Sequence, residues 1–204
     1  MRLDIGDTAI TELLTVLSAD ETERANRFVE KRARRQYVIS RAAIREILGT
    51  YIAMTPRDIA FTVTGDGKPA LAAPNELEIE FNTSHSGGLV VIGVSRSRQI
   101  GVDVEQVRPV PKALQLAKRF FSASEYAMLS ELPEDEVARA FLAIWVAREG
   151  TAKAQGLSVW RGLAKLETPA GWRAELLDLG RDYVGVVVAA DEDWRVVRRG
   201  QLRF

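Results

Sequence analysis

The chain has 204 residues, with 28 basic and 28 acidic side chains, one histidine and no cysteine. Its 47% hydrophobic and 27% charged content is typical of a soluble globular protein rather than a disordered chain. The balanced charge excludes a global electrostatic field, so we expect neither nucleic acid nor membrane as a partner. Disulfides, cysteine nucleophiles and multi-histidine zinc sites are excluded, which leaves carboxylates as the candidate metal ligands.

The N-terminal segment, residues 1–21, mixes acidic with apolar residues and lacks both a continuous apolar core and a small-residue cleavage site. It is therefore not expected to be a signal peptide. No apolar run approaches the roughly 18 residues of a membrane span. We expect a cytoplasmic protein.

The first half is predicted to begin with helices and continue with strands. Ser18 and Glu21 have the spacing of a capping box, which starts a helix that runs through Arg24 and Phe28. A second helix is predicted over residues 33–51 from the helical spacing of its apolar residues, and the arginines on its other sides are typical of a solvated face. Strands are expected at 58–63, 77–81, 89–94 (buried on both faces) and 100–107, with a turn at 65–69.

The second half starts after Pro109 and Pro111 and is again predicted to place helices before strands. Ser122 and Glu125 repeat the capping-box spacing, and Gly156 ends a long helix. The helices are expected at 113–121, from 122 onward and at 136–155, and the strands at 162–168, 172–179, 182–189 and 194–197.

The two halves resemble each other in pattern. The segment 35–49 is similar to 139–156, and the strand at 88–94 is similar to 180–188. We therefore predict an α+β fold of two pseudo-symmetric halves, 1–107 and 108–204, each with a small sheet packed on helices. The interface between such halves is a natural ligand site.

Two acidic residues lie on one face of a predicted strand. Side chains alternate across a strand, so Asp103 and Glu105 share a face while Val102 and Val104 point to the other. An exposed strand edge has this pattern, and so does a site for Mg²⁺, which prefers a few carboxylates, water and phosphate oxygens. The pair alone favours the exposed edge.

Three other segments carry polar groups that also have ordinary explanations. Glu149 and Lys153 are four residues apart on one helix face, which fits either a surface ion pair or a third metal carboxylate beside a phosphate-binding cation. His85 lies in a polar segment that we expect to be a loop, with Ser84 and Ser86 as further donors to an anion. Lys68 is predicted on the turn. No P-loop and no GxGxxG motif is present, so any phosphate chemistry would use side chains and a metal.

Taken in chain order, these motifs closely resemble the Sfp-type 4′-phosphopantetheinyl transferases from about Leu17 to Gly156. The resemblance is carried by Gly-Lys-Pro at 67–69, Phe-Asn-Thr-Ser-His-Ser at 81–86, Ile-Gly-Val-Asp-Val-Glu at 100–105, the Phe-Phe-Ser segment at 117–126 and the Trp-to-Gly pattern at 145–156. Each motif alone is weak, but their order and spacing are specific to this family.

The resemblance implies a function and a set of site residues. It implies an enzyme that transfers the 4′-phosphopantetheine arm of coenzyme A to a serine of an apo acyl or peptidyl carrier protein and releases adenosine 3′,5′-bisphosphate. Mg²⁺ would be the cofactor and coenzyme A the co-substrate. Catalysis would depend on Glu149, Asp103 and Lys153, and the metal ligands would be Asp103, Glu105 and Glu149. Coenzyme A would contact Arg24, Arg35, Lys68, Pro69, Ser84, His85, Arg148 and Lys153.

The chain departs from the family pattern where Arg148-Glu149-Gly150 replaces the usual Lys-Glu-Ala. Arginine keeps the charge but changes its geometry, and glycine costs a helix roughly 1 kcal/mol relative to alanine. We expect a monomer, because the two halves supply both sides of the cleft, with Lys112, Lys118 and Arg119 as candidate contacts to an acidic carrier. The alternatives are a metal-dependent phosphohydrolase of coenzyme A or a nucleotide, and a non-catalytic module that binds coenzyme A or a carrier protein.

Overall fold

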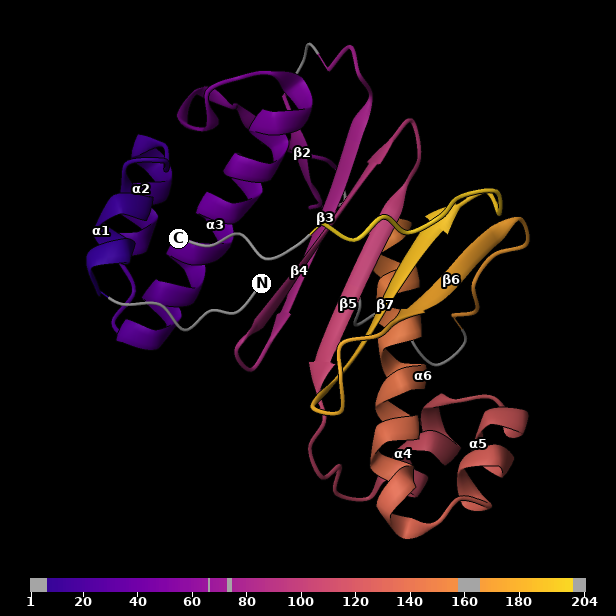
Figure 1. The fold of residues 1–204 in the computed structure, drawn as a ribbon. Coiled ribbons are helices and arrows are strands. Elements are labelled where there is room, and N and C mark those ends of the chain that lie inside the picture. The colour runs from indigo at the N-terminus through magenta and orange to yellow at the C-terminus, as the bar shows by residue number, and fades with distance from the viewer. Residues whose placement is uncertain (1–6, 66, 73–74, 158–165, 200–204) are drawn as a thin grey trace.

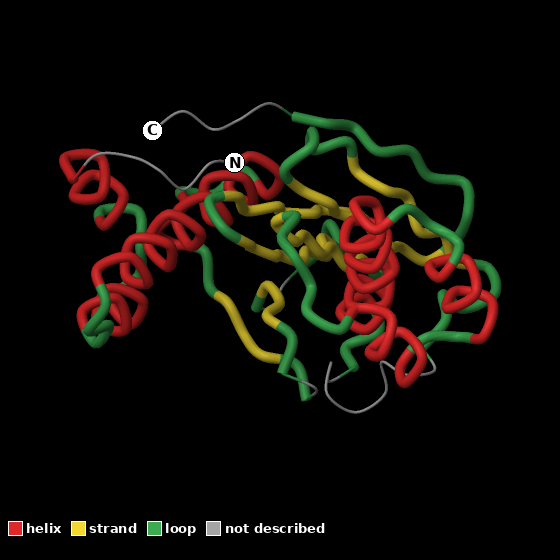
Figure 2. Tube along the Cα trace, turned by 90° about the horizontal axis from the view of Figure 1, so that it is seen from below, coloured by secondary structure: helices red, strands yellow, loops and turns green. Residues whose placement is uncertain are grey.

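The strands of the protein lie between two groups of helices (Figures 1 and 2). The computed structural model describes residues 7–65, 67–72, 75–157 and 166–199. One group comprises α1 (Asp7–Leu14), α2 (Ala19–Asn26) and α3 (Lys31–Ile52), and the other α4 (Ala113–Phe120), α5 (Ala123–Ser130) and α6 (Glu134–Ala154). Within the described ranges, none of the helices combines the length and apolar character needed to cross a membrane.

The strands form three small antiparallel sheets. β1 (Phe61–Val63) pairs with β2 (Pro69–Leu71), and β3 (Ile79–Ser86) pairs with β4 (Leu89–Arg96). The third sheet has the order β5 (Ile100–Gln106), β7 (Tyr183–Ala190), β6 (Trp172–Leu177). The predicted α+β class, with small sheets packed on helices, is confirmed. β5 precedes residue 107 but hydrogen-bonds to β7, so one sheet contains strands from both of the predicted halves.

Both predicted capping boxes are present. The backbone N–H of Glu21 donates to Ser18 Oγ at 3.3 Å, and the N–H of Ser18 donates to Glu21 Oε2 at 3.1 Å. Ser122 and Glu125 make the same reciprocal pair at 3.2 and 2.7 Å. Each box satisfies backbone N–H groups that a helix start would otherwise leave unpaired, which explains why the sequence locates these starts well.

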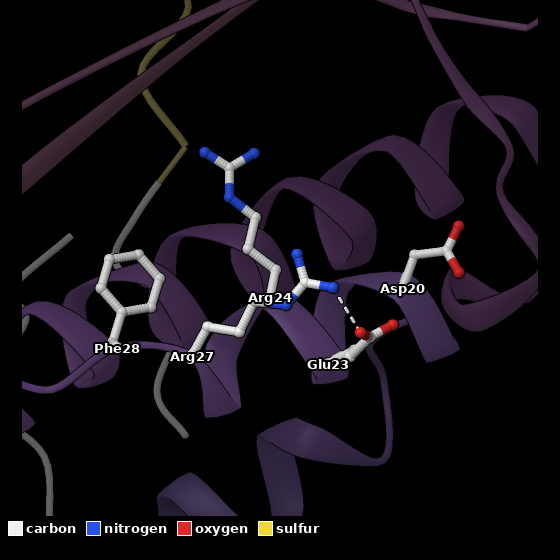
Figure 3. A pocket seen from close by; sticks show the side chains of 5 residues that line it. All are labelled: Asp20, Glu23, Arg24, Arg27 and Phe28. Atoms are coloured by element: carbon white, nitrogen blue, oxygen red, sulfur yellow. Dashed lines mark hydrogen bonds and ion pairs between the residues drawn. The ribbon is translucent and has the colours of Figure 1, made fainter.

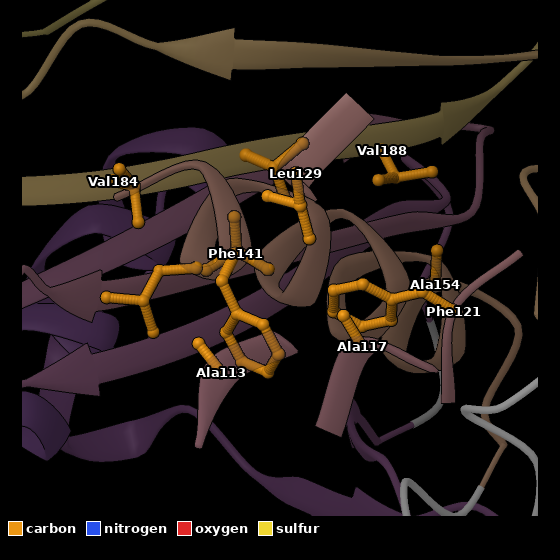
Figure 4. Close-up of a cluster of buried hydrophobic side chains, with 11 residues drawn as sticks. Ala113, Ala117, Phe121, Leu129, Phe141, Ala154, Val184 and Val188 are labelled. Carbon is orange, nitrogen blue, oxygen red and sulfur yellow. The ribbon is translucent and has the colours of Figure 1, made fainter. Parts of the chain in front are cut away.

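The largest core lies between the second helical group and the sheet (Figure 4). Val184, Val186 and Val188 on one face of β7 pack against α6, which contributes Phe141 and Val146 among others. The apolar face of β7 therefore holds α6 flat on the sheet, so that residues on α6 and β5 come together.

The arginines of α3 do not form the solvated face that the sequence predicts. Arg45 is only 2% exposed. Its Nε donates to Glu21 Oε2 at 2.6 Å, and its Nη1 donates to the carbonyls of Pro56 and Ile59 at 2.7 and 3.0 Å. Arg41 also pairs with Glu21. A buried charge requires such partners, and here they tie α3 to α2 and to the 3₁₀ turn η1 (Pro56–Asp58).

Several predicted strand boundaries are wrong. The segment 82–86 is not a loop but the second half of β3, and β4 is mostly half-buried rather than buried on both faces. The segment 194–197 forms no strand. Trp194 instead packs under the guanidinium of Arg173, whose central carbon lies 4.0 Å from the centroid of the Trp194 ring. Of the predicted strand at 162–168, residues 162–165 lie outside the described residues and 166–168 are not a strand.

Candidate active site

Asp103 is the most deeply buried carboxylate of the site. It lies on β5 and is 2% exposed. Its Oδ1 accepts hydrogen bonds from Lys153 Nζ of α6 at 2.6 Å and from Ser84 Oγ of β3 at 2.7 Å. Its Oδ2 is also buried and finds no hydrogen-bond partner in the part of the chain that the structure describes. An acceptor in that state is costly unless a cation or another donor meets it.

Two glycines allow α6 to approach β5 closely enough for this contact. A Cβ on Gly101 would lie 2.1 Å from the carbonyl oxygen of Gly150 and 2.5 Å from the amide nitrogen of Ala154. A Cβ on Gly150 would lie 2.7 Å from Val186 Cγ1 and 3.1 Å from Val188 Cγ2. Gly150, which looks like a defect in a helix, is therefore required by the packing beneath it.

Gly150→Ala is expected to lower the free energy of unfolding by about 1 kcal/mol. The methyl group would overpack against the stiff side chain of Val186, which outweighs the gain of roughly 1 kcal/mol in helix propensity. Urea unfolding of the variant and the wild type checks this. A stabilisation of about 1 kcal/mol, as helix propensity alone predicts, would contradict it.

Glu149 has a strongly raised pKa. Burial, and after it the negative charges of Asp103 and Glu105, raise the pKa of this carboxyl from 4.5 to about 7, against a lowering effect of Lys153 and of a hydrogen bond involving Trp145. These interactions require the three carboxylates to be near one another. A carboxyl with a pKa near neutrality is suited to accept a proton at physiological pH.

Glu105 is the more exposed of the two carboxylates on β5. Ser86 Oγ donates to its Oε2 at 2.8 Å, and Arg108 lies 3.6 Å from the same oxygen. In the described ranges, no three acidic or histidine side chains are already arranged as a metal cluster. The ammonium of Lys153 occupies the position beside Asp103 Oδ1 and neutralises that carboxylate.

The sequence matches the models of a known protein family. The sequence model of the 4′-phosphopantetheinyl transferase superfamily matches residues 99–188, and that of the 4′-phosphopantetheinyl transferase N-terminal region matches residues 7–97. A relative from a Nostoc species, named 4′-phosphopantetheinyl transferase HetI, is 39% identical over 166 residues, which cover 81% of this chain and 68% of the relative. The chain belongs to this transferase family.

Other relatives carry the same family name. The 4′-phosphopantetheinyl transferase Sfp of Bacillus subtilis is 30% identical over 143 residues, which cover 70% of this chain and 62% of Sfp. The 4′-phosphopantetheinyl transferase AcpT of Salmonella typhimurium is 40% identical over 96 residues, which cover 47% of this chain and 48% of AcpT. The predicted Sfp-type resemblance is confirmed. The matched region covers 62% of the length of Sfp.

Ser84 and His85, predicted together as contacts of coenzyme A, point to opposite faces of β3. Ser84 lies against Asp103 and Lys153, whereas His85 is exposed. The separation follows from the strand that replaces the predicted loop, because neighbouring side chains of a strand alternate.

Lys68 and Pro69 lie at the start of β2. Lys68 is not the solvated lysine that its turn suggests, because its side chain is 12% exposed and its Nζ lies 3.3 Å from Glu80 Oε2 and 3.4 Å from the carbonyl oxygen of Ile100. The lysine therefore lies beside the first residue of β5, while Pro69 is exposed.

The predicted arginines are dispersed. Arg148 is 5% exposed, donates to Glu125 Oε2 at 2.6 Å and stacks over Phe121, so it would have to leave Glu125 to reach a phosphate. Arg35 is half-buried on α3. Arg24 lies on α2, 5.4 Å from the ring centroid of Tyr37, and lines an open surface pocket of about 640 Å³ (Figure 3). That pocket also contains Asp20, Glu23, Arg27 and Phe28.

Two side chains of β3 have contacts that the sequence did not predict: Asn82 bonds to the backbone of β5, and Ser86, predicted only as a donor to an anion, bonds to Glu105. Both face β5 from the same side of β3 as Ser84. The signal was the period-two recurrence of short polar side chains at 82, 84 and 86, which is typical of one face of a strand.

Proposed function

We propose that this protein transfers the 4′-phosphopantetheine arm of coenzyme A to a serine of an apo carrier protein. Family membership and the names of the relatives support this reaction. The observation that carries the proposal is the contact between β5 and α6. There Lys153 binds one oxygen of Asp103, the other oxygen is buried without a partner among the described residues, and the pKa of Glu149 is raised.

Asp103, Glu105 and Glu149 would hold Mg²⁺. Asp103 Oδ2, which has no partner in the described segments, fits a cation, and a small set of carboxylate oxygens suits Mg²⁺, which keeps several waters and adds phosphate oxygens. When bound, the ion would neutralise charge on the pyrophosphate of coenzyme A. Lys153 would add a further positive charge at the same place.

The transfer would form one phosphorus–oxygen bond and break another. The carrier serine hydroxyl attacks the β-phosphorus of coenzyme A, its proton passes to Glu149 directly or through water, and adenosine 3′,5′-bisphosphate leaves. Without the ion the pKa of Glu149 is about 7. The positive charge of a bound ion would lower this pKa, so the carboxyl would be ionised and able to accept the proton at neutral pH. Positioning and charge neutralisation supply most of the rate in such reactions.

The remaining residues would bind the partners. Lys68, Pro69, Ser84, His85, Arg35 and Arg24 are proposed contacts of coenzyme A, with Arg148 as a contact only if it releases Glu125. The cationic residues of α4 and its N-terminal flank, Lys112, Lys118 and Arg119, are proposed contacts of an acidic carrier. We propose a cytoplasmic monomer.

Mass spectrometry of an apo carrier protein incubated with this protein, coenzyme A and Mg²⁺ tests the proposal. A mass gain of one phosphopantetheine is expected, and a carrier whose acceptor serine is replaced by alanine is expected to gain nothing. Turnover of coenzyme A without any carrier would instead support a phosphohydrolase. Tight binding of coenzyme A or carrier without either reaction would support a binding module.

A further inference from the structure

A row of polar side chains on β3 covers the free edge of β5. Among the described strands β5 pairs only with β7, so every second N–H of β5 points to the other edge and has no strand partner there. Asn82 Oδ1 accepts from the N–H of Val102 at 3.0 Å and Ser86 Oγ from that of Gln106 at 3.0 Å. Ser84 Oγ accepts from the N–H of Val104 at 3.3 Å. The constant separation of 20 residues shows that β3 and β5 run in the same direction.

The two serines of this row also contact the two carboxylates of β5. Ser84 Oγ donates to Asp103 Oδ1 at 2.7 Å, and Ser86 Oγ donates to Glu105 Oε2 at 2.8 Å. Each hydroxyl thus joins a carboxylate to the N–H of the next residue along β5. Within the described residues, the Asn82 side chain makes only the backbone contact. The repeated geometry indicates that the serines do more than seal a strand edge.

The chemistry of a hydroxyl explains the double contact. A serine has one hydrogen to donate and lone pairs to accept, so accepting from the backbone N–H leaves its hydrogen for the carboxylate. Because β5 is held by its pairing with β7, the N–H fixes the serine, and the serine then restricts the carboxylate. Hydrogen bonds of this kind orient metal-binding carboxylates in proteins and strengthen metal affinity.

We propose that Ser86 is a positioning residue that orients Glu105 for a divalent cation, an inference that rests on the proposed function. Ser86 is the informative member of the row, because Ser84 also accepts from Lys153 Nζ at 3.0 Å and is a proposed contact of coenzyme A. Glu105 also lies near a cationic side chain, because Arg108 Nη2 is 3.6 Å from Glu105 Oε2, but the Arg108 side chain is more than half exposed. Exposed pairs of this kind restrain a side chain little.

The test compares Ser86→Ala with Ser86→Thr and with a matched control, Ser95→Ala. Threonine keeps the hydroxyl on the same carbon and suits a strand. Ser95 is a half-buried serine of β4 whose hydroxyl donates to the carbonyl oxygen of Arg98 at 2.5 Å, away from both carboxylates. The measurements are Mn²⁺ binding by electron paramagnetic resonance with saturating coenzyme A, the Mg²⁺ concentration that gives half-maximal transfer, and the unfolding midpoint.

Ser86→Ala is expected to weaken Mn²⁺ binding and to raise the half-maximal Mg²⁺ concentration by about tenfold, the usual effect of losing such a hydrogen bond. Saturating Mg²⁺ is expected to restore most of the rate, and Ser86→Thr and Ser95→Ala to remain close to the wild type. A loss of stability alone would lower the amount of active protein without moving the Mg²⁺ midpoint.

The outcomes separate this inference from the proposed function. Unchanged Mn²⁺ affinity in Ser86→Ala, or a wild type that binds no Mn²⁺, would overturn the role of Ser86. Weakened Mn²⁺ binding in Ser86→Ala, together with a wild type that transfers nothing to any carrier, would support the positioning role while contradicting the transferase reaction.

Discussion

Asp103→Asn is expected to lower the rate of phosphopantetheine transfer by at least about 10²–10³-fold, the scale on which loss of one key electrostatic group slows an enzyme. Asparagine preserves the size of the side chain and one carbonyl oxygen, but it removes the negative charge that faces Lys153 and the proposed cation. The NH₂ group of the asparagine binds a metal poorly. If it takes the place of the buried Oδ2 it removes a metal ligand, and if it takes the place of Oδ1 it faces the ammonium of Lys153. The rate is measured as the mass gain of a carrier protein over time.

The control for Asp103→Asn is Glu175→Gln. Glu175 lies on β6 and pairs with Arg173 at 3.0 Å on the surface. This variant loses the same charge and is expected to transfer at the wild-type rate. Asp103→Asn also removes the ion pair with Lys153, which could lower the stability of the fold. Circular dichroism and thermal unfolding of the variant therefore accompany the assay. A folded Asp103→Asn protein with near wild-type transfer would refute the assignment of this carboxylate to the site.

Glu149→Gln is expected to reduce transfer by about 10²–10⁴-fold, the contribution that a general base commonly makes, and at the same time to stabilise the cation-free fold at high pH. Folding raises the pKa of Glu149 from 4.5 to about 7, so the folded state binds more protons than the unfolded state in this window. Stability therefore falls as pH rises from 4.5 to 7 and stays low above it.

The gain from Glu149→Gln at pH 8 is expected to be on the order of 1 kcal/mol, after allowing for solvent screening of this half-buried side chain. Near pH 4.5 the wild type regains most of its proton, and the two proteins should be almost equally stable. Urea unfolding in the presence of a chelator at pH 4.5 and pH 8 measures both values. An equal difference at the two pH values would show that ionisation of Glu149 is not its cause.

Local signals in the sequence predicted a large part of the fold. The capping boxes at Ser18 and Ser122 set helix starts through contacts three residues apart, the apolar spacing of α3 marks its length, and Gly156 marks the end of α6. The alternation in 100–105 predicts a strand with Asp103 and Glu105 on one face. Such features depend on near neighbours in the chain, so they are readable without knowledge of the tertiary structure.

Two buried polar features differ from what the sequence predicts. The segment 82–86 looked like a loop because it is polar, yet its polar face is needed to satisfy the backbone N–H groups of β5. Arg45 looked solvated, yet it is paired with Glu21 and with backbone carbonyls in the interior. In both cases a partner distant in sequence satisfies the polar group, and no local pattern reveals that partner.

The sequence by itself determined most of the helices and several of the strands, the family and the chemical identity of the candidate site residues, because these depend on residue type, order and spacing. Only the tertiary structure decided that Gly101 and Gly150 let α6 lie on β5, that Asp103 contacts Lys153 through one buried oxygen, and that burial raises the pKa of Glu149. The reason is physical: close packing, desolvation and interaction between charges depend on distances between residues that are far apart along the chain.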